Sequence, residues 1–226
     1  MLKEKVLVFP ANLINKQTFS DHGGIIANPA EVNYIRNTIL KSGQLSFMDR
    51  KLAEEDEGFL QLIPYILLAN SDGSYFSYAR TTKGGESRLH SKYSVGLGGH
   101  INPVDSTNLS EPNDTSLLNC VVRELREEIG IKLNLDFSLQ NVALIFCDAT
   151  PVDRVHFGLA VVLRLDTSDE SIKLEDALAK GEFVPWKHLK YYENLENWSK
   201  LLVDKVLSQY HETPDCSGCV DELSCK

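Results

Sequence analysis

The chain has 226 residues, of which 42% are hydrophobic and 24% are charged, a composition typical of a globular protein with one sizeable core. Its formal net charge is −9 at pH 7. Such an acidic chain is a poor partner for long nucleic acid, because the phosphate backbone requires Lys and Arg to replace its counterions. Small phosphorylated ligands stay compatible with it, since a bound metal ion can reverse the local field.

The apolar runs and the cysteines of the chain predict the cellular compartment of the protein. The chain contains no run of about 18 apolar residues, so we expect no membrane-spanning helix. The apolar run at residues 6–9 is too short for a secretion signal. An odd total of five cysteines does not predict a disulfide framework, and Cys120 and Cys147 are expected to be buried thiols in apolar segments. We therefore expect a cytoplasmic protein.

Hydrophobic periodicity predicts both strands and helices along the chain. In chain order, we expect a strand at 4–9, a helix at 29–40, strands at 61–68, 74–80, 141–148 and 155–165, a short strand or turn at 181–186, and a helix at 192–207. Residues 10–29 are expected to form a loop, and the acidic run 54–57 a loop or solvated face. A further helix is expected before Gly130, with a glycine-rich segment upstream of it.

The helix before Gly130 carries three closely spaced carboxylates. Glu124, Glu127 and Glu128 have the spacing i, i+3, i+4, which places them in one narrow sector of a helix. Like charges packed this closely repel each other, so a structural helix gains nothing from them. A hard divalent cation with oxygen ligands would turn the repulsion into binding energy. The triplet is therefore the first candidate for a functional site.

An apolar stripe orients this helix. The stripe consists of Leu118, Val122, Leu125 and Ile129. The carboxylates lie beside it, so we expect them at the border of the buried face. Gly130 is expected to end the helix as its C-cap, and the candidates for the N-cap are Asp114, Thr115 and Ser116.

The carboxylate helix and its upstream glycines resemble the box of the Nudix hydrolase superfamily, G-x5-E-x7-R-E-U-x-E-E-x-G-U, where U is a bulky aliphatic residue. Residues 123–131, with the sequence RELREEIGI, match the second half in full. In the first half, Gly99 is followed at the required spacing by Asp105 instead of glutamate, and ten more residues than in the pattern separate Asp105 from Arg123. A loop insertion of this size costs little free energy. Asp105 and Glu111 are alternative replacements for the glutamate.

The resemblance covers about residues 60–207 and implies an α/β fold, the Nudix α/β/α sandwich with a mixed sheet between helices. We expect residues 1–59 to be an N-terminal extension packed on the same domain, 60–210 the Nudix domain, and 211–226 a cysteine-containing tail. Three segments are similar to a MutT-type branch described as predicted phosphoesterases: 61–65, 98–102 and 155–158.

The resemblance also implies an activity and a set of site residues. Family members cleave a phosphoanhydride bond in a nucleoside polyphosphate or nucleoside diphosphate derivative, with Mg2+ or Mn2+ as cofactor. The candidate metal ligands are Glu124, Glu127, Glu128 and the carbonyl of Gly98 or Gly99. The candidate catalytic residues are Glu124, Glu127, Arg123, which would hold the carboxylates in place, and Glu182. The candidate substrate contacts are Arg80, Lys83, Arg88, Gly99 and His100. We expect the partner to be a small phosphorylated substrate of the nucleotide class. A homodimer is an open alternative for the oligomeric state.

Two other functions compete with hydrolysis. One is a Nudix-fold nucleotide-binding or sensing module without turnover, but such proteins usually lose box carboxylates and this chain keeps all three. The other is an isopentenyl-diphosphate isomerase-like enzyme, which needs a catalytic cysteine near the glycine region. Cys120 lies on the helix and Cys147 on a later strand, so we disfavour the isomerase.

Two further features have ordinary structural explanations. His156 lies in a strand with alternating pattern, and we expect a packed residue rather than a ligand. Cys216, Cys219 and Cys225, with His211 as a fourth candidate, have a spacing that suits zinc. A second tight ligand pair is missing, so we favour a tail with reactive thiols and keep a Zn2+ site as the alternative.

Overall fold

The computed structural model describes residues 3–81, 92–109, 112–133, 139–165, 172–176 and 178–208. The first half of the chain forms β1 (Lys5–Pro10), α1 (Lys16–Asp21), β2 (Ile25–Ile26), α2 (Pro29–Leu40), β3 (Ser46–Asp49), α3 (Arg50–Ala53), β4 (Phe59–Asn70), β5 (Ser74–Arg80), β6 (Tyr93–Ser94) and β7 (Gly96–Gly98). The second half forms α4 (Asp114–Ile129), β8 (Leu139–Ile145), β9 (His156–Leu165), β10 (Leu178–Pro185), α5 (Trp186–Leu189) and α6 (Asn197–Leu202), which continues as a π-helical turn, Val203–Leu207.

A ten-stranded mixed sheet forms the centre of the molecule. Its main order is β10-β5-β4-β9-β8-β2, while β1 and β7 also pair with β4, β3 pairs with β1, and β6 pairs with β5. The two long strands β4 and β9 run parallel over their whole common length, and the other strand pairs are antiparallel. Both long strands are buried on both faces, which explains why they appear in the sequence as nearly continuous apolar runs.

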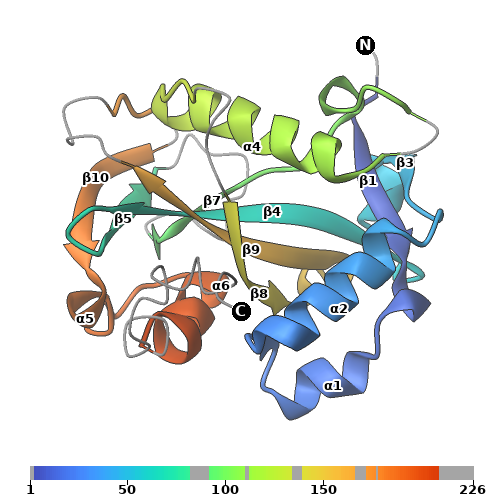
Figure 1. Cartoon of the computed structure of the whole chain (residues 1–226), viewed down its shortest axis with the longest axis horizontal. Coiled ribbons are helices and arrows are strands. Elements are labelled where there is room, and N and C mark those ends of the chain that lie inside the picture. Colours follow the sequence, from blue (N-terminus) through green and yellow to red (C-terminus); the bar gives the residue numbers. More distant parts are fainter. Residues whose placement is uncertain are drawn as a thin grey trace, which may run out of the picture.

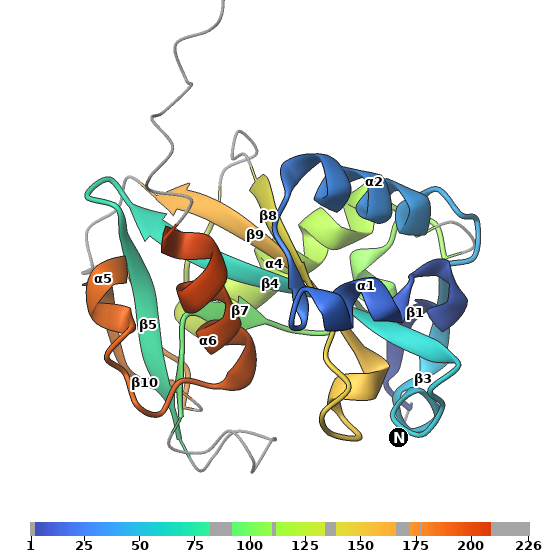
Figure 2. The same cartoon turned by 90° about the horizontal axis from the view of Figure 1, so that it is seen from below.

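Helices cover both faces of the sheet. Side chains of α2 and α4 pack with one set of strand residues, including Leu62, Ile66 and Val161, in a first core. The chain around α5 and α6 packs with the alternate set, including Leu67 and Val162, in a second core. Figure 1 shows α4 and α6 on opposite sides of β4 and β9, and Figure 2 shows α6 from below. None of the helices in the described ranges has the length and hydropathy to cross a bilayer.

The N-terminal part of the chain is built into this sheet. β1 pairs with β4, β2 pairs with β8, and the rings of Phe9 and Phe157 meet edge to face at 5.3 Å. The expectation of a plain loop at 10–29 is wrong, because α1 begins there behind its N-cap Asn15. The last helix also begins later than expected, at Asn197 instead of residue 192, where Glu196 accepts hydrogen bonds from the first backbone N–H groups.

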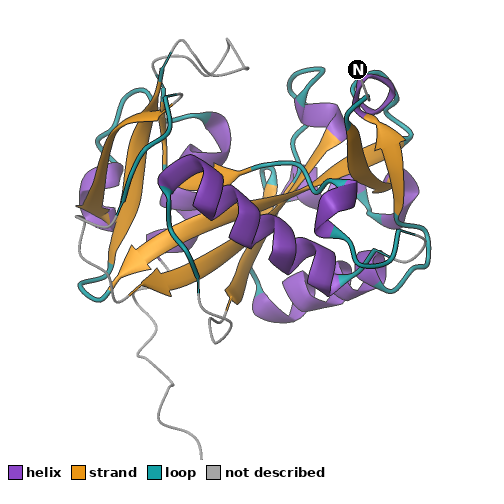
Figure 3. Ribbon diagram, turned by 90° about the horizontal axis from the view of Figure 1, so that it is seen from above, coloured by secondary structure: helices purple, strands orange, loops and turns teal. Residues whose placement is uncertain are grey.

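The helix α4 forms where the sequence predicts it and lies across the sheet (Figure 3). Its buried face, however, is rotated from the predicted one. Asn113, not one of the three residues that follow it, is the N-cap, whereas Gly130 ends the helix as expected with φ of 71°. Leu118 is 38% exposed. The buried residues of α4 are Ser116, Leu117, Cys120, Val121, Glu124, Leu125 and Ile129. One carboxylate of the triplet is therefore buried rather than at the border.

Candidate active site

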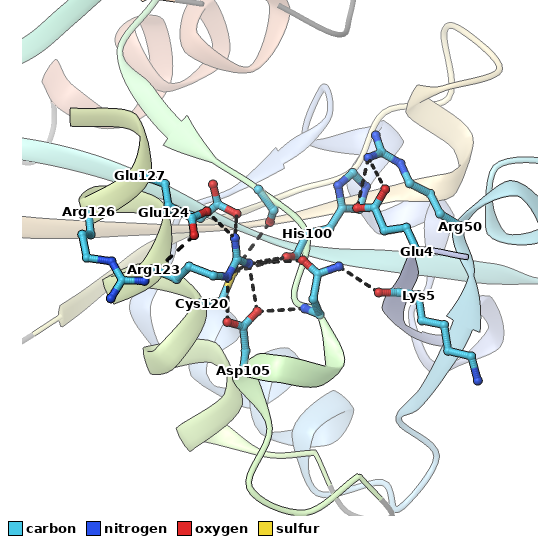
Figure 4. Close-up of polar contacts among 12 residues, drawn as sticks. Glu4, Lys5, Arg50, His100, Asp105, Cys120, Arg123, Glu124, Arg126 and Glu127 are labelled. Atoms are coloured by element: carbon cyan, nitrogen blue, oxygen red, sulfur yellow. Dashed lines mark hydrogen bonds and ion pairs between the residues drawn. The ribbon is translucent and has the colours of Figure 1, made fainter. Parts of the chain in front are cut away.

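Arg123 is the centre of the polar contacts between α4 and the preceding glycine segment (Figure 4). Its guanidinium donates to both carboxylate oxygens of Asp105, from Nε at 2.8 Å and from Nη2 at 2.9 Å. It also donates from Nη1 to Glu124 at 2.7 Å and to Glu127 at 3.2 Å, and from Nη2 to the carbonyl of His100 at 2.9 Å. The planar guanidinium contacts all of these oxygens at the same time and therefore fixes their positions relative to each other.

Asp105 is also held in place by a backbone hydrogen bond at the start of its own turn. It ends the 3-10 turn Pro103–Asp105, and its Oδ2 accepts a hydrogen bond from the backbone N–H of Asn102 at 2.8 Å. Only 3% of the residue is exposed. Of the two candidates for the missing box glutamate, Asp105 is the one that contacts Arg123, and Glu111 lies outside the described residues.

Glu124 lies directly against the glycine segment. A Cβ atom on Gly99 would lie 2.0 Å from Oε1 of Glu124 and 2.2 Å from its Cδ, so only glycine leaves room for this carboxylate. Burial raises the pKa of Glu124, and the neighbouring Arg123 opposes the shift. Gly99, the first glycine of the predicted box, therefore accommodates one of the box carboxylates.

Glu128 is the least satisfied carboxylate of the triplet. Its Oε2 atom is inaccessible to solvent and has no hydrogen-bond partner among the described residues. Burial raises the pKa of Glu128 to about 8 against the opposing charge of Arg80, and Glu124 adds to the rise. Leaving a buried carboxylate oxygen unpaired is costly, so this atom marks a position where a positive ligand would be stabilised.

Arg80, a predicted substrate contact, lies at this side of the sheet. It ends β5, and its Nη2 donates to the hydroxyl of Tyr78 at 3.0 Å. That hydroxyl in turn donates to the carbonyl of Gly96 at 2.8 Å, within the first core that α4 covers. The structure therefore brings Arg80 into the electrostatic environment of Glu128.

The three carboxylates fit a hard divalent cation. Glu124 is buried, Glu128 has an unpaired buried oxygen, and the side chain of Glu127 is 51% exposed. Within the described residues, Arg123 alone forms ion pairs within 4 Å to more than one member of the triplet. Oxygen ligands with excess negative charge suit Mg2+ or Mn2+.

Some of the predicted residues do not meet at the box. Glu182 pairs in register with Ser77 and accepts a hydrogen bond from the hydroxyl of Tyr192 at 3.4 Å. Val184, two residues further along β10, belongs to the second core, so Glu182 faces the side of α5 and α6 and not α4. The structure thus gives no support to a catalytic role for Glu182. Lys83, Arg88 and the cysteine tail lie outside the described residues.

His100 follows Gly98 and Gly99 in the sequence, but its imidazole ring points away from the box carboxylates. Figure 4 shows His100 on the side of the glycine segment that faces Arg50 and Glu4. Its Nε2 lies 3.4 Å from Nε2 of His156, whose ring was expected to be merely packed. Glu54, from the acidic run that was expected to be solvated, lies near both rings. Sequence reasoning missed this second cluster because its members come from three distant segments.

Cys120 lies closer to the glycine segment than the sequence suggested. Its Sγ is 3.6 Å from the carbonyl of His100 and 4.0 Å from that of Gly99. The residue is completely buried, and burial raises the pKa of its thiol well above the ordinary value. A buried thiol without thiolate character is a poor catalyst, so its position does not favour the isomerase alternative.

No protein-family model matches the chain. Protein YmaB of Bacillus subtilis (strain 168) is 32% identical over 206 residues, which cover 90% of this chain and 97% of YmaB. The crystal structure of Tm1382, which is assigned to the Nudix hydrolases, superposes with a TM-score of 0.64 at 24% identity, covering 89% of this chain and 97% of that chain. The Nudix domain of NrtR from Shewanella oneidensis, complexed with ADP ribose, is 10% identical with a TM-score of 0.49, covering 68% of this chain and 89% of that chain.

The likeness to Tm1382 confirms the predicted α/β/α sandwich. The TM-score of the NrtR domain is too low to support a conclusion. The identity to YmaB extends over nearly the full length of both chains, which is sufficient to show common family membership. With the box sequence placed on α4 of a fold that Tm1382 shares, the chain belongs to the same family as protein YmaB.

Proposed function

We propose that the protein is a metal-dependent hydrolase that cleaves a phosphoanhydride bond in a nucleoside polyphosphate or a nucleoside diphosphate derivative. The observation that carries the proposal is the buried, unpaired oxygen of Glu128 beside the buried Glu124, on a helix whose Arg123 is fixed by Asp105. The complete set of box carboxylates in a Nudix fold supports turnover over mere binding.

Glu124, Glu127 and Glu128 would hold the ion, with the backbone carbonyl of Gly98 as a further candidate ligand. When bound, Mg2+ or Mn2+ would neutralise charge on the phosphate oxygens and lower the pKa of a coordinated water. Arg123 would keep the carboxylates in position through its contacts to Glu124 and Glu127. Glu182 has no role in this proposal, because it lies on the face of the sheet opposite to α4.

The reaction itself needs a nucleophile, a proton acceptor and charge stabilisation. A water oxygen would bond to phosphorus while the bridging P–O bond breaks, and the proton of the water would pass to a carboxylate. Glu127 is exposed enough to meet water, and Glu124 is the alternative acceptor. Arg80, at the end of β5, would contact a phosphate of the substrate, and its position beside Tyr78 in the electrostatic environment of Glu128 supports this role.

A substrate panel tests this proposal. The purified chain, stripped of metal with a chelator, would be incubated with nucleoside di- and triphosphates, dinucleoside polyphosphates, nucleotide sugars and capped RNA. Each substrate would be assayed without metal, with Mg2+ and with Mn2+, and phosphate products would be resolved by chromatography. We expect at least one substrate to be cleaved at a phosphoanhydride bond, and only after metal is added back.

The same panel, extended by isopentenyl diphosphate, separates the competing functions. Tight binding of a nucleotide without turnover would replace the hydrolase by the binding-module alternative. Rearrangement of isopentenyl diphosphate that is lost in Cys120→Ser would favour the isomerase-like alternative. Hydrolysis that persists in Cys120→Ser agrees with the proposal, because the buried thiol has no part in it.

A further inference from the structure

A second group of potential metal ligands lies on the far side of the glycine segment from α4. It consists of Glu54 at the end of α3, His100 after β7, and His156 at the start of β9. One ligand atom from each residue lies within 4.8 Å of the other two. This second cluster shares no side chain with the carboxylates of α4.

The tautomer of His156 is set by the backbone. Its Nδ1 lies 2.7 Å from the carbonyl of Val152. A carbonyl only accepts hydrogen bonds, so Nδ1 must carry the proton and Nε2 of the neutral ring presents a lone pair. Histidines that bind metals commonly donate their second ring N–H to a backbone carbonyl in this way. His156 is 7% exposed, so most of its side chain is shielded from solvent, and its free nitrogen faces Nε2 of His100.

The distance between the two rings suits a shared ion. The Nε2 atoms of His100 and His156 lie 3.4 Å apart, with the ring planes at 66°. Two nitrogens bound at about 2.0–2.1 Å to a tetrahedral ion lie about 3.3 Å from each other. A hydrogen bond between the rings would be shorter, since N–H donors usually lie about 3.0 Å from their acceptor. The observed spacing therefore fits a bridging cation better than a direct hydrogen bond.

Glu54 supplies the carboxylate. Its Oε1 lies 4.0 Å from Nε2 of His156 and 3.5 Å from Nε of Arg50. Arg50 faces the cluster as an opposing cation, but it also pairs with Glu4 at 3.1 Å. The partly exposed Glu54 can therefore move towards the two rings at little cost, because Arg50 keeps Glu4 as its carboxylate partner.

A neighbouring buried amide lacks partners. Gln61 pairs in register with His156, so the two side chains share a face of the sheet. It is completely buried, and neither polar atom of its amide has a hydrogen-bond partner among the described residues. Unpaired buried amides cost free energy, and a polar occupant beside His156 would satisfy this one.

We propose that Glu54, His100 and His156 bind a zinc-type transition-metal ion at a site separate from the carboxylates of α4. Two imidazole nitrogens and one carboxylate suit Zn2+ rather than Mg2+, and they leave a fourth position for water. The ion would join α3, the glycine segment and β9, and so hold Gly99 beside Glu124. The proposal does not depend on the hydrolase activity.

Zinc titration of the full-length chain tests the site. The background would be Cys216→Ser/Cys219→Ser/Cys225→Ser, because the tail cysteines can bind zinc by themselves. Excess Mg2+ would occupy the carboxylates of α4, and a chromophoric chelator would compete for Zn2+. We expect one equivalent to bind, and His156→Asn, which keeps a donor for the Val152 carbonyl, to weaken binding at least about tenfold.

The control is His22→Asn, since His22 also bonds a backbone carbonyl through Nδ1 but is exposed and lies on α1's C-terminal side. It should bind Zn2+ like the background chain. Glu54→Gln provides a second, partly exposed position if His156→Asn does not fold, and it too should weaken binding. Absence of a bound equivalent in the background chain, or unchanged affinity in either cluster variant, would overturn the proposal. Loss of hydrolysis with zinc binding intact would refute the proposed function alone.

Discussion

At the scale of single residues, Arg123 decides the geometry of the box. It takes two hydrogen bonds to Asp105 on one side and reaches Glu124 and Glu127 on the other. The side chains of Arg123 and Asp105 are only 17% and 3% exposed, so their attraction is weakly screened. Asp105 thus supports the carboxylates without touching them.

Asp105→Asn should therefore destabilise the fold. The amide keeps one acceptor but loses the charge that faces Arg123, which retains Glu124 and Glu127 as partners. We expect a loss of about 2 kcal/mol in the free energy of unfolding, measured by urea denaturation. Asp105→Glu, which restores the carboxylate of the family pattern, should lose less. Equal stability of Asp105→Asn and the unsubstituted chain would contradict the role of this pair.

Gly99→Ala should affect activity more than folding. The new Cβ would lie 2.0 Å from Oε1 of Glu124, so this carboxylate has to move from its position. We expect turnover to fall at least about tenfold, because displacement of a site group by about 1 Å is costly in catalysis. Gly43→Ala is the control, since a Cβ there meets nothing within 4 Å although its φ is 67°. It should lower the melting temperature slightly and leave turnover unchanged; a similar loss of turnover in both would count against the close approach.

At the scale of elements, α4 carries its charges on a partly buried face. The sequence predicted the helix and its glycine stop but misplaced the buried stripe, because Leu118 and Leu117 are equally apolar and only contact with the sheet selects Leu117. The short elements α1, β3 and α3 were missed for a related reason. Segments of four to six residues are too short to show a period of their own.

The burial of Glu128, with a smaller contribution from the neighbouring Glu124, should appear as a pH dependence in the metal-free chain. The pKa of Glu128 is raised to about 8, so between pH 4.5 and this value the folded chain binds more protons than the unfolded chain. Stability of the metal-free protein therefore falls as pH rises through this window. Above pH 8, the free energy of unfolding of Glu128→Gln should exceed that of the unsubstituted chain by at least about 1 kcal/mol, with a correspondingly higher melting temperature, and the two should differ little near pH 4.5.

Thermal unfolding in a chelating buffer measures this effect. Glu193→Gln, at an exposed glutamate, serves as the control and should shift the melting temperature equally at both pH values. A Glu128→Gln variant that is no more stable than the unsubstituted chain at high pH would show that burial of the ionised carboxylate does not destabilise the fold.

At the scale of the whole molecule, the sheet brings distant segments together at two places. The box unites α4 with the glycine segment, and its second half was recognisable because residues 123–131 keep the full spacing of the motif. The second cluster unites α3, the glycine segment and β9, which no local pattern connects. For this reason the sequence could predict Glu124, Glu127 and Glu128 as a group, but not Glu54 and His156.

The contact between Asp105 and Arg123 also required the fold. No local pattern shows that the 3-10 turn before the inserted loop directs Asp105 to Arg123. The parallel pairing of β4 with β9 was equally hidden, since buried strands of either direction look alike in sequence. The expected boundary at residues 59 and 60 stays a prediction, although β1 joins the same sheet as β4.

Turnover by Glu127→Gln tests the central claim most directly. The substitution removes one negative charge and leaves the size of this half-exposed side chain unchanged. With the best substrate of the panel and saturating Mg2+, we expect the turnover rate to fall at least about 100-fold. Glu193→Gln should turn over at the unsubstituted rate. Undiminished turnover by Glu127→Gln would contradict the assignment of metal-assisted hydrolysis to the carboxylates of α4.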